Sequence, residues 1–452
     1  MADVELSSLT ACQAVAEIAR GAISAEDYTR ACLARIAQVE DEIQAFAHLD
    51  PEHAIAQAQE LDARKAQGGA LGPLHGVPVA IKDIIDTQDY PTEFGSPLFK
   101  GRRPYTDATV VSRLRSAGAV IIGKTVTTEF AYYNPGKTRN PHDPERTPGG
   151  SSSGSAAAVA SGMVPLAIGT QTNGSIIRPA SFCGVFGAKP SHGLVSRHGA
   201  LSLSRALDHI GPFARTLEDL GLILETLAGF DPEDADTRAI AVPQFRKAVT
   251  EKFPLDPRFA LVRTPIWDKA DAATQAAFDQ LAEKLGSACF VLDLPPRYAE
   301  AWDAQRTVMA VDMAHRFGAL VDKRGEGVSE MMRDLVAEGR KVSAMQYLAA
   351  RDLARSMAKG LNDMFDECNA FITPATVGVA PKGLQATGNP AFCSLWTLTG
   401  LPALSLPLLE GEDGMPLGVQ LIGATNDDVR LFRTASWLIS KVAPKGTRRR
   451  TR

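Results

Sequence analysis

The hydrophobic and polar positions of this chain alternate between helical periodicity and short apolar runs. Residues 5–65 have the helical pattern. Ser8 or Thr10 can cap a first helix, Ser24 can cap a second, and Asp50 followed by proline can start a third. The amino-terminal part is therefore predicted to be a group of helices.

After several glycines and prolines near residue 70, strand and helix patterns alternate. Short apolar runs predict buried strands, and the first of these ends at Lys82. Alternation of this kind favours a largely parallel or mixed sheet with helices on both faces. The predicted strands are 78–81, 119–122 and 164–168, and the predicted helices are 107–117, capped by Asp107, and 155–161.

From about residue 215 to residue 365 the pattern becomes mostly helical, and sheet patterns return near the end of the chain. There is no internal repeat and no low-complexity linker. We therefore predict an α/β protein, a single-domain α/β/α sandwich around a central twisted mixed sheet, with a helical insertion. The elements predicted in this half are helices opening at Thr216 and covering 301–321 and 343–365, strands beginning at Ala370, Ala403 and Val419, and a closing helix at 427–442.

The composition is that of an ordinary globular protein. Of 452 residues, 45% are hydrophobic and 22% are charged, and the formal net charge is −4, so a basic face for nucleic acid is not expected. No apolar run is long enough to cross a membrane, and the first residues lack the pattern of a secretory leader. Six scattered cysteines fit reduced thiols. We expect a cytoplasmic protein, with the basic residues 445–452 as a solvated tail.

Residues 118–125 match the phosphate-loop pattern G-x-x-x-x-G-K-[ST]. A phosphate loop needs exposed backbone between a strand and a helix. Residues 119–122 are instead an apolar run that should itself be a strand. Nucleotide binding is therefore a minor alternative.

Residues 150–154 match the G-x-S-x-G elbow, which would make Ser152 the nucleophile of an α/β-hydrolase. The residues before this elbow predict a loop, whereas the elbow needs a strand there. Ser356 and Lys359 match S-x-x-K, but they lie in a predicted helix and lack the companion motifs. An exposed helix face is the better interpretation of that pair.

A third pattern covers nearly the whole chain. Its segments are GVPVAIKD at 76–83, TPGGSSSGSAAAVASG at 147–162, GTQTNGSIIRPASFCGVFGAKPS at 169–191, LDHIGPFART at 207–216, and LTGLPALSLP with GVQLIG near the C-terminus. Through these segments the sequence resembles the amidase signature family of serine hydrolases. The resemblance implies the amidase signature fold over residues 1–452, with N-terminal helices at about 5–65, a signature core at about 70–215 and a more variable helical substrate-pocket region at about 240–365.

The resemblance implies that Ser175 is the nucleophile, that Ser151 is a bridging serine held on a cis peptide, and that Lys82 is the base. The 24 positions from Ser151 to Ser175 fit the signature. A serine hydroxyl needs a neighbouring base at neutral pH, and a lysine can serve where burial lowers its pKa. Lys82 suits this role because it ends an apolar strand. An intervening serine can donate to one neighbour while accepting from the other.

Backbone N–H groups of Thr172, Asn173, Gly174 and Ser175 are expected to converge as an oxyanion hole. Asn173 departs from the common form of the signature, because many relatives have glycine at this position. Asparagine tolerates left-handed backbone better than most residues, so the turn is expected to survive. The Asn173 side chain is a candidate for the pocket.

Thr170 and Arg178 are candidates for substrate binding. A guanidinium can contact a substrate carboxylate through two hydrogen bonds. The better-supported interpretation is that Arg178 braces the signature loop through carbonyls or an internal acid such as Asp208. Thr170 and Asp208 are also candidate supports behind the site, and Cys183 is expected to pack in the core.

These inferences predict an amidohydrolase that cleaves the C–N bond of a small or aryl carboxamide through a seryl acyl-enzyme, with carbamate or ester hydrolysis as further options. The expected partner is a small-molecule amide, with no nucleic acid, no membrane and a possible homodimer. No histidine pair has metal-ligand spacing, so neither a metal nor another cofactor is expected.

The main alternative within the same signature is the amidase subunit of a glutamine-dependent amidotransferase, which passes ammonia onward to a partner. The stretch from Thr170 to Arg178 differs from the usual form of that subunit. Apolar residues within 290–365 are expected to form a pocket wall, although core packing at helical spacing is the commoner role for such residues. They are Trp302, Met309, Met313, Phe317 and Tyr347.

Overall fold

Eleven strands form one mixed sheet in the part of the chain that the computed structural model describes, residues 6–253 and 255–442. The strand order is β1-β3-β2-β4-β6-β5-β10-β11-β9-β7-β8. The neighbours in β3-β2-β4 and β9-β7-β8 are parallel and the other neighbours are antiparallel. The strands are β1 Phe46–Leu49, β2 Pro78–Lys82, β3 Val120–Thr125, β4 Leu166–Gln171, β5 Phe186–Lys189, β6 His209–Ala214, β7 Phe259–Arg263, β8 Cys289–Asp293, β9 Ala370–Pro374, β10 Ala403–Glu410 and β11 Pro416–Ile422.

Both faces of the sheet are buried, because successive side chains of a central strand enter different cores. In β2, Val79 and Ile81 belong to one hydrophobic cluster and Ala80 belongs to the other. Strand β4 alternates in the same way, with Ala167 in the cluster of Ala80. Burial on both faces explains why these strands read as continuous apolar runs.

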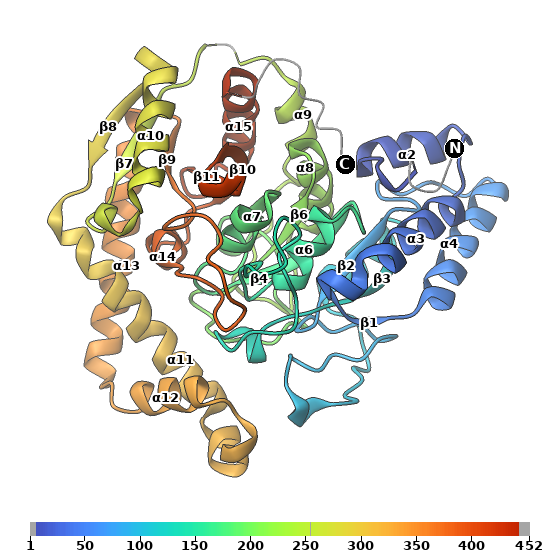
Figure 1. Ribbon diagram of the computed structural model, residues 1–452, viewed down its shortest axis with the longest axis horizontal. Coiled ribbons are helices and arrows are strands. Elements are labelled where there is room, and N and C mark those ends of the chain that lie inside the picture. Colours follow the sequence, from blue (N-terminus) through green and yellow to red (C-terminus); the bar gives the residue numbers. More distant parts are fainter. Residues whose placement is uncertain (1–5, 254, 443–452) are drawn as a thin grey trace.

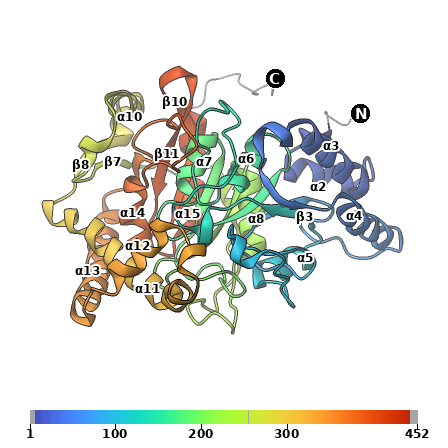
Figure 2. The ribbon, with the colours of Figure 1, turned by 60° about the horizontal axis from the view of Figure 1, so that its bottom comes forward.

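Helices cover both faces, which confirms the predicted α/β/α sandwich. Residues of α3, α4, α6 and α7 pack into the cluster that contains Ala80, and residues of α5, α8, α9 and α15 pack into the other. The N-terminal helices lie at one end of the molecule and α10–α13 at the other, as Figures 1 and 2 both show. The helices are α2 Ala11–Ala19, α3 Ala25–Ile43, α4 Pro51–Ala66, α5 Thr109–Ser116, α6 Ser153–Ala160, α7 Ile177–Cys183, α8 Leu217–Leu227, α9 Phe245–Thr250, α10 Ala272–Leu285, α11 Ala301–Arg324, α12 Glu330–Gly339, α13 Ala344–Asp363, α14 Ala391–Leu398 and α15 Asp428–Val442.

The N-terminal helices begin at the residues that the sequence indicates. Thr10, Ser24 and Asp50 cap α2, α3 and α4, and each side chain accepts a hydrogen bond from the backbone N–H three residues later. Such caps satisfy donors that have no partner within the helix. Helix α5 differs, because its cap is Ala108, and the Asp107 carboxylate instead accepts from Arg115 at 2.9 Å.

Two strands, β7 and β8, lie in the region predicted to be mostly helical, so that prediction is wrong for 259–263 and 289–293. Strand β8 is a short strand at the edge of the sheet and is only partly buried. Helix α12 lies within the region predicted to be mostly helical, although its bounds were not predicted. The strands at 370–374, 403–410 and 416–422 and the closing helix α15 confirm the expected return of the sheet.

No helix within 6–253 and 255–442 is long and apolar enough to cross a membrane. The six cysteines are unpaired, and Cys183 is buried as expected, with its Sγ 3.4 Å from the Pro148 carbonyl. The predicted basic tail, 445–452, lies outside the described residues.

Candidate active site

The ends of β2 and β4 bring three candidate polar side chains together. These two strands are parallel neighbours, so their carboxyl ends meet at the same edge of the sheet. Lys82 ends β2, and its Nζ donates to Ser151 Oγ at 2.7 Å and to Thr170 Oγ1 at 2.7 Å. Thr170 therefore holds the lysine. Of the two roles expected for Thr170, substrate binding and support behind the site, this contact favours support.

Lys82 is fully buried, with an exposed fraction of 0%. Desolvation lowers the pKa of its amine well below the usual range, and the charge of nearby Asp208 partly opposes that shift. This shift favours the neutral amine, and a neutral amine can accept a proton.

Ser151 reaches Lys82 from the glycine-rich loop that precedes α6. The Gly150–Ser151 peptide is cis, as the resemblance implied. Gly149 has a φ of 83°, and a Cβ there would lie 2.8 Å from the Pro179 backbone, so glycine is required for two reasons. The loop therefore packs directly on the start of α7, which follows Ser175.

Ser175 lies in the turn between β4 and α7. The Gln171 side chain holds this turn by accepting from the backbone N–H groups of Ile176 and Ile177 at 2.8 and 3.0 Å. Ser151 and Ser175 line the same cavity. Within the described residues no hydrogen bond joins their hydroxyls, and such contacts often tighten only when substrate is bound.

The oxyanion hole expected at residues 172–175 stays a prediction, and the hydrogen bonds of this turn bear on it. Among the backbone hydrogen bonds of the described residues outside helices and strands, none uses an N–H group from 172 to 175. The carbonyls of this turn point to protein donors instead: Thr172 O accepts from Gln305, and Asn173 O accepts from the Thr397 hydroxyl. The N–H groups stay available for a developing negative charge.

Asn173 contributes through its side chain, because its φ is not positive and the left-handed backbone that we considered is not needed. Its Nδ2 donates to the Tyr133 hydroxyl at 3.2 Å, and its Oδ1 accepts from Ser394 at 2.8 Å. It lines the cavity that contains Ser175. The asparagine therefore shapes the pocket wall.

Arg178 is buried, and both terminal nitrogens of its guanidinium donate to the protein, whereas its Nε has no hydrogen-bond partner among the described residues. Its guanidinium donates to the carbonyls of Gly388 at 2.9 Å and Gly150 at 2.7 Å, and to the Thr387 hydroxyl at 3.1 Å. These contacts join α7 to the glycine-rich loop and to a C-terminal loop. Asp208 is not its partner; that carboxylate accepts from the Thr172 hydroxyl at 2.7 Å.

Ser152 lies outside the constellation. Its hydroxyl is fully buried and exchanges two hydrogen bonds of 3.2 Å with the backbone of Thr170. The elbow interpretation of Ser152 is therefore not supported by its position. Ser356 and Lys359 lie on α13, where Lys359 is exposed and pairs with Asp363 at 3.1 Å.

The phosphate-loop alternative fails on structure. Residues 120–125 are β3, and all six are buried. Lys124 donates to the carbonyls of Ile85 and Pro91 at 2.9 and 3.2 Å, so its amine is used inside the protein. No exposed backbone is available there to hold a phosphate.

The cavity has about 310 Å³ of empty volume, part of it open to solvent. Of the five apolar residues expected as a pocket wall, Met309 lines it, whereas Met313 and Phe317 are buried in the core. The sequence patterns missed several wall residues that come from loops, namely Ala131, Tyr132, Tyr133 and Leu203. The backbone beside them is unusual, because Phe130 and Ala131 have φ values of 49° and 55°, which non-glycine residues rarely adopt.

Fold and site together define a serine hydrolase of amide bonds, and comparisons with known proteins identify its family. The amidase family matches residues 27–432. The chain belongs to the amidase family, which confirms the resemblance drawn from the signature segments.

Relatives of known function cover the whole fold. Over 471 residues the chain is 37% identical to one subunit of the glutamyl-tRNA(Gln) amidotransferase of Chloroflexus aurantiacus, covering 95% of this chain and 96% of the relative. It is also 37% identical over 485 residues to the protein of the same name from Salinispora arenicola, covering 97% and 98%.

Solved structures give the same fold. A structure of "an unexpected vestigial protein complex" that "reveals the evolutionary origins of an s-triazine catabolic enzyme" superposes with a TM-score of 0.89 and 31% identity, covering 96% of this chain and 99% of the other. The peptide amidase of Stenotrophomonas maltophilia gives 0.84 and 29%, covering 96% and 97%. The 6-aminohexanoate cyclic dimer hydrolase gives 0.85 and 27%, covering 98% and 99%.

One expectation needs correction. The expectation of a small-molecule amide and at most a second copy of the chain as partners is wrong, because relatives aligned over 95% of this chain are named as subunits of an amidotransferase. Composition and charge did not reveal this, since a protein interface needs no unusual net charge.

Proposed function

We propose that this chain hydrolyses a carboxamide C–N bond through an acyl-enzyme on Ser175. The hydrogen bond of 2.7 Å from the fully buried Lys82 to Ser151 carries the proposal, because it supplies a base of lowered pKa beside a hydroxyl relay. The available N–H groups of 172–175 support the same chemistry.

In the proposed reaction, Ser175 Oγ bonds to the amide carbon while its proton passes to Ser151 and the proton of Ser151 passes to neutral Lys82. The carbonyl oxygen becomes negative and accepts hydrogen bonds from the turn. The C–N bond then breaks, and the leaving nitrogen takes the proton back through Ser151. Water hydrolyses the acyl-enzyme by the same relay in reverse.

We further propose that the chain works as the amidase subunit of a glutamine-dependent amidotransferase, with glutamine as the amide and ammonia as the released product. The relatives named as amidotransferase subunits, at 37% identity over nearly the full length, support this setting better than any feature of composition. A protein partner is part of the proposal, and the cytoplasm remains the proposed location.

A small or aryl carboxamide is the second candidate substrate, with carbamates and esters beside it. One observation favours it: the cavity wall is largely uncharged, with Tyr132, Tyr133, Leu203 and Met309, and the guanidinium of Arg178 is used by protein acceptors. A free amino acid would need charged partners at both its amino and carboxylate groups.

The test measures ammonia or amine release from glutamine and from a panel of small and aryl amides, carbamates and esters, with Ser175→Ala as the blank. The protein is assayed alone and as isolated with any co-purifying protein. Glutaminase activity that appears only with the co-purified protein supports the amidotransferase setting. Turnover of aryl amides by the chain alone, without glutaminase activity, favours the second candidate. Unimpaired turnover by Ser175→Ala refutes the mechanism.

A further inference from the structure

A second cavity adjoins the catalytic one, and Leu203 lines both. This outer cavity has about 1370 Å³ of empty volume, including space open to solvent. The backbone N–H of Leu203 donates to Asp208 at 2.8 Å, and the same carboxylate accepts from Thr172 in the nucleophile turn. The shared wall is therefore tied directly to the catalytic cavity.

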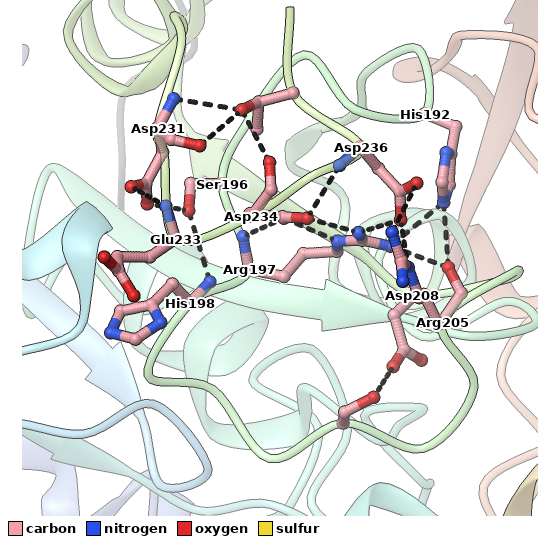
Figure 3. Close-up of polar contacts among 12 residues, drawn as sticks. His192, Ser196, Arg197, His198, Arg205, Asp208, Asp231, Glu233, Asp234 and Asp236 are labelled. Carbon is pink, nitrogen blue, oxygen red and sulfur yellow. Dashed lines mark hydrogen bonds and ion pairs between the residues drawn. The ribbon is translucent and has the colours of Figure 1, made fainter.

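One of the two carboxylates that line the outer cavity is neutralised by arginine. Asp236 accepts from Arg197 and, at 2.8 Å, from Arg205. Figure 3 shows the Arg197 side chain extended between Asp234 and Asp236, with Arg205 beside Asp236. Two arginines form ion pairs with Asp234 and Asp236, so the negative charge of these carboxylates is largely neutralised.

The second carboxylate, that of Asp312, is also occupied. It accepts from the hydroxyl of Ser204 and, at 2.8 Å, from the hydroxyl of Tyr347. These bonds connect α11 and α13 to the segment that carries Leu203. The carboxylate thus acts as a fixed acceptor between elements.

Two arginines of the same cavity lack such a partner. Arg351 donates to the Tyr347 hydroxyl at 3.1 Å and forms no ion pair with a described residue. Arg316 forms neither a hydrogen bond nor an ion pair with any residue in 6–253 or 255–442. Each guanidinium carries five donors, so most of these donors are unused. The cavity beside the catalytic site therefore holds unpaired positive charge.

We infer that the outer cavity binds a carboxylate of the substrate through Arg351 and Arg316. Planar guanidinium groups match a carboxylate with paired hydrogen bonds. This inference rests on the proposed amide hydrolysis at Ser175 and narrows its substrate class to amides that carry a carboxylate away from the reacting carbonyl. A carboxylate site outside the catalytic cavity agrees with the contacts of Arg178, whose terminal nitrogens donate to protein acceptors and not to a substrate carboxylate.

The experiment compares matched amides that differ by one carboxylate. Adipamate and hexanamide place the charge on the acyl side, and N-acetyl-γ-aminobutyrate and N-propylacetamide place it on the amine side. The measured quantity is the ratio of kcat/KM, charged over neutral, for the protein with any co-purifying partner. Binding of adipamate and hexanamide to Ser175→Ala is measured by calorimetry in parallel, so the answer does not depend on turnover.

We expect the charged member of at least one pair to be preferred about tenfold or more, as a charged hydrogen bond provides. Arg351→Gln and Arg316→Gln should each reduce the ratio toward one, and added salt should reduce it as well. Arg324→Gln removes the same charge from an exposed position of α11 outside the cavity, and it should keep the wild-type ratio.

Equal kcat/KM values in both pairs would overturn the inference and leave amide hydrolysis standing. A ratio that falls equally in Arg324→Gln would overturn it too, because the effect would then come from net charge alone. Loss of all amide turnover, with a preference for adipamate in calorimetry, would refute the proposed hydrolysis while supporting the carboxylate site.

Discussion

Lys82 Nζ and Ser151 Oγ are 2.7 Å apart although 69 positions separate them in the chain, and both groups are buried. The contact exists because β2 ends beside the glycine-rich loop that leads into α6. The lysine has no carboxylate partner at hydrogen-bond distance, so nothing nearby fully offsets the cost of charging it.

Alanine substitutions of the neighbouring serines 151 and 152 should have different effects, one on kcat and the other on stability. Ser151→Ala removes the hydroxyl that accepts from Lys82, and the loss of a proton relay should lower kcat by roughly 10²- to 10⁴-fold. Ser152→Ala removes a bond to the Thr170 backbone and should mainly reduce stability, by about 1 kcal/mol. Steady-state kinetics and urea unfolding of both variants measure this difference. A larger loss of turnover in Ser152→Ala would contradict the assignment.

The activity should depend on the neutral form of Lys82. Burial lowers its pKa, so the neutral base is present above the folded-state pKa, and kcat/KM falls as the pH decreases through that value. Asp208 raises this pKa through its charge, and Asp208→Asn should therefore move the ascending limb of the pH profile to lower pH.

The measurement is kcat/KM from pH 5 to 10 for the wild type and Asp208→Asn, with Asp322→Asn as the control. Asp322 is exposed on α11, far along the chain from the site, and pairs with Arg340. A limb that moves to higher pH in Asp208→Asn would show that the carboxylate does not act on Lys82 by its charge.

Most core strands that are buried on both faces were predictable, because such strands are continuous apolar runs, although β7, which is also buried and apolar, was missed. Strand β6 was missed for a physical reason: it contains Gly211 and Pro212, which argue against a central strand, yet it pairs with both β4 and β5. Edge strands β1 and β8 were missed because they are short and partly exposed. These segments are strands because they pair with neighbouring strands, and local sequence patterns carry no information on that pairing.

The residues of the candidate site also divide into those that the sequence indicates and those that only the fold brings to the cavity. Lys82, Ser151 and Ser175 belong to contiguous signature segments, so the sequence alone indicates them. Tyr133 and Leu203 come from loops with no motif, and they reach the cavity only through the fold. The direction of the Arg178 donors likewise depends on the loop at 387–388, over 200 positions away.

Thr397 should matter for catalysis although it is remote in the chain from Ser175. Its hydroxyl accepts from Gln171 at 2.9 Å and donates to Asn173 O, so it fixes the turn that lines the cavity. Thr397→Val keeps the shape but leaves the partly buried Asn173 carbonyl without that donor, a loss of about 1 to 3 kcal/mol.

We expect kcat to fall more than tenfold in Thr397→Val, with KM little changed, because the turn acts mainly on the transition state. Thr434→Val removes an equally buried hydroxyl on α15, which bonds only within its own helix, and serves as the control. Equal kinetics in the two variants would contradict the role of Thr397 in the turn.

Lys189 should make stability depend on pH independently of catalysis. Burial lowers the pKa of Lys189 to about 7, and its amine lies 3.4 Å from His209 Nε2, whose own pKa is lowered well below the usual range by burial. An unfolded lysine has a pKa of about 10.4, so the unfolded state binds more protons between these values. The free energy of unfolding therefore rises with pH from about 7 to 10.4 and is lost again as the pH decreases toward 7.

Lys189→Met removes this linkage, and the slope of unfolding free energy against pH between 7 and 9.5 should decrease relative to the wild type. The full effect is on the order of 4 kcal/mol across the window. Urea unfolding at several pH values measures the slope, and Lys359→Met, on an exposed position of α13, should keep the wild-type slope. Because the test compares slopes, a uniform loss of stability from the unpaired Leu401 carbonyl does not affect it. Equal slopes in Lys189→Met and the wild type would mean that Lys189 stays charged inside the folded protein.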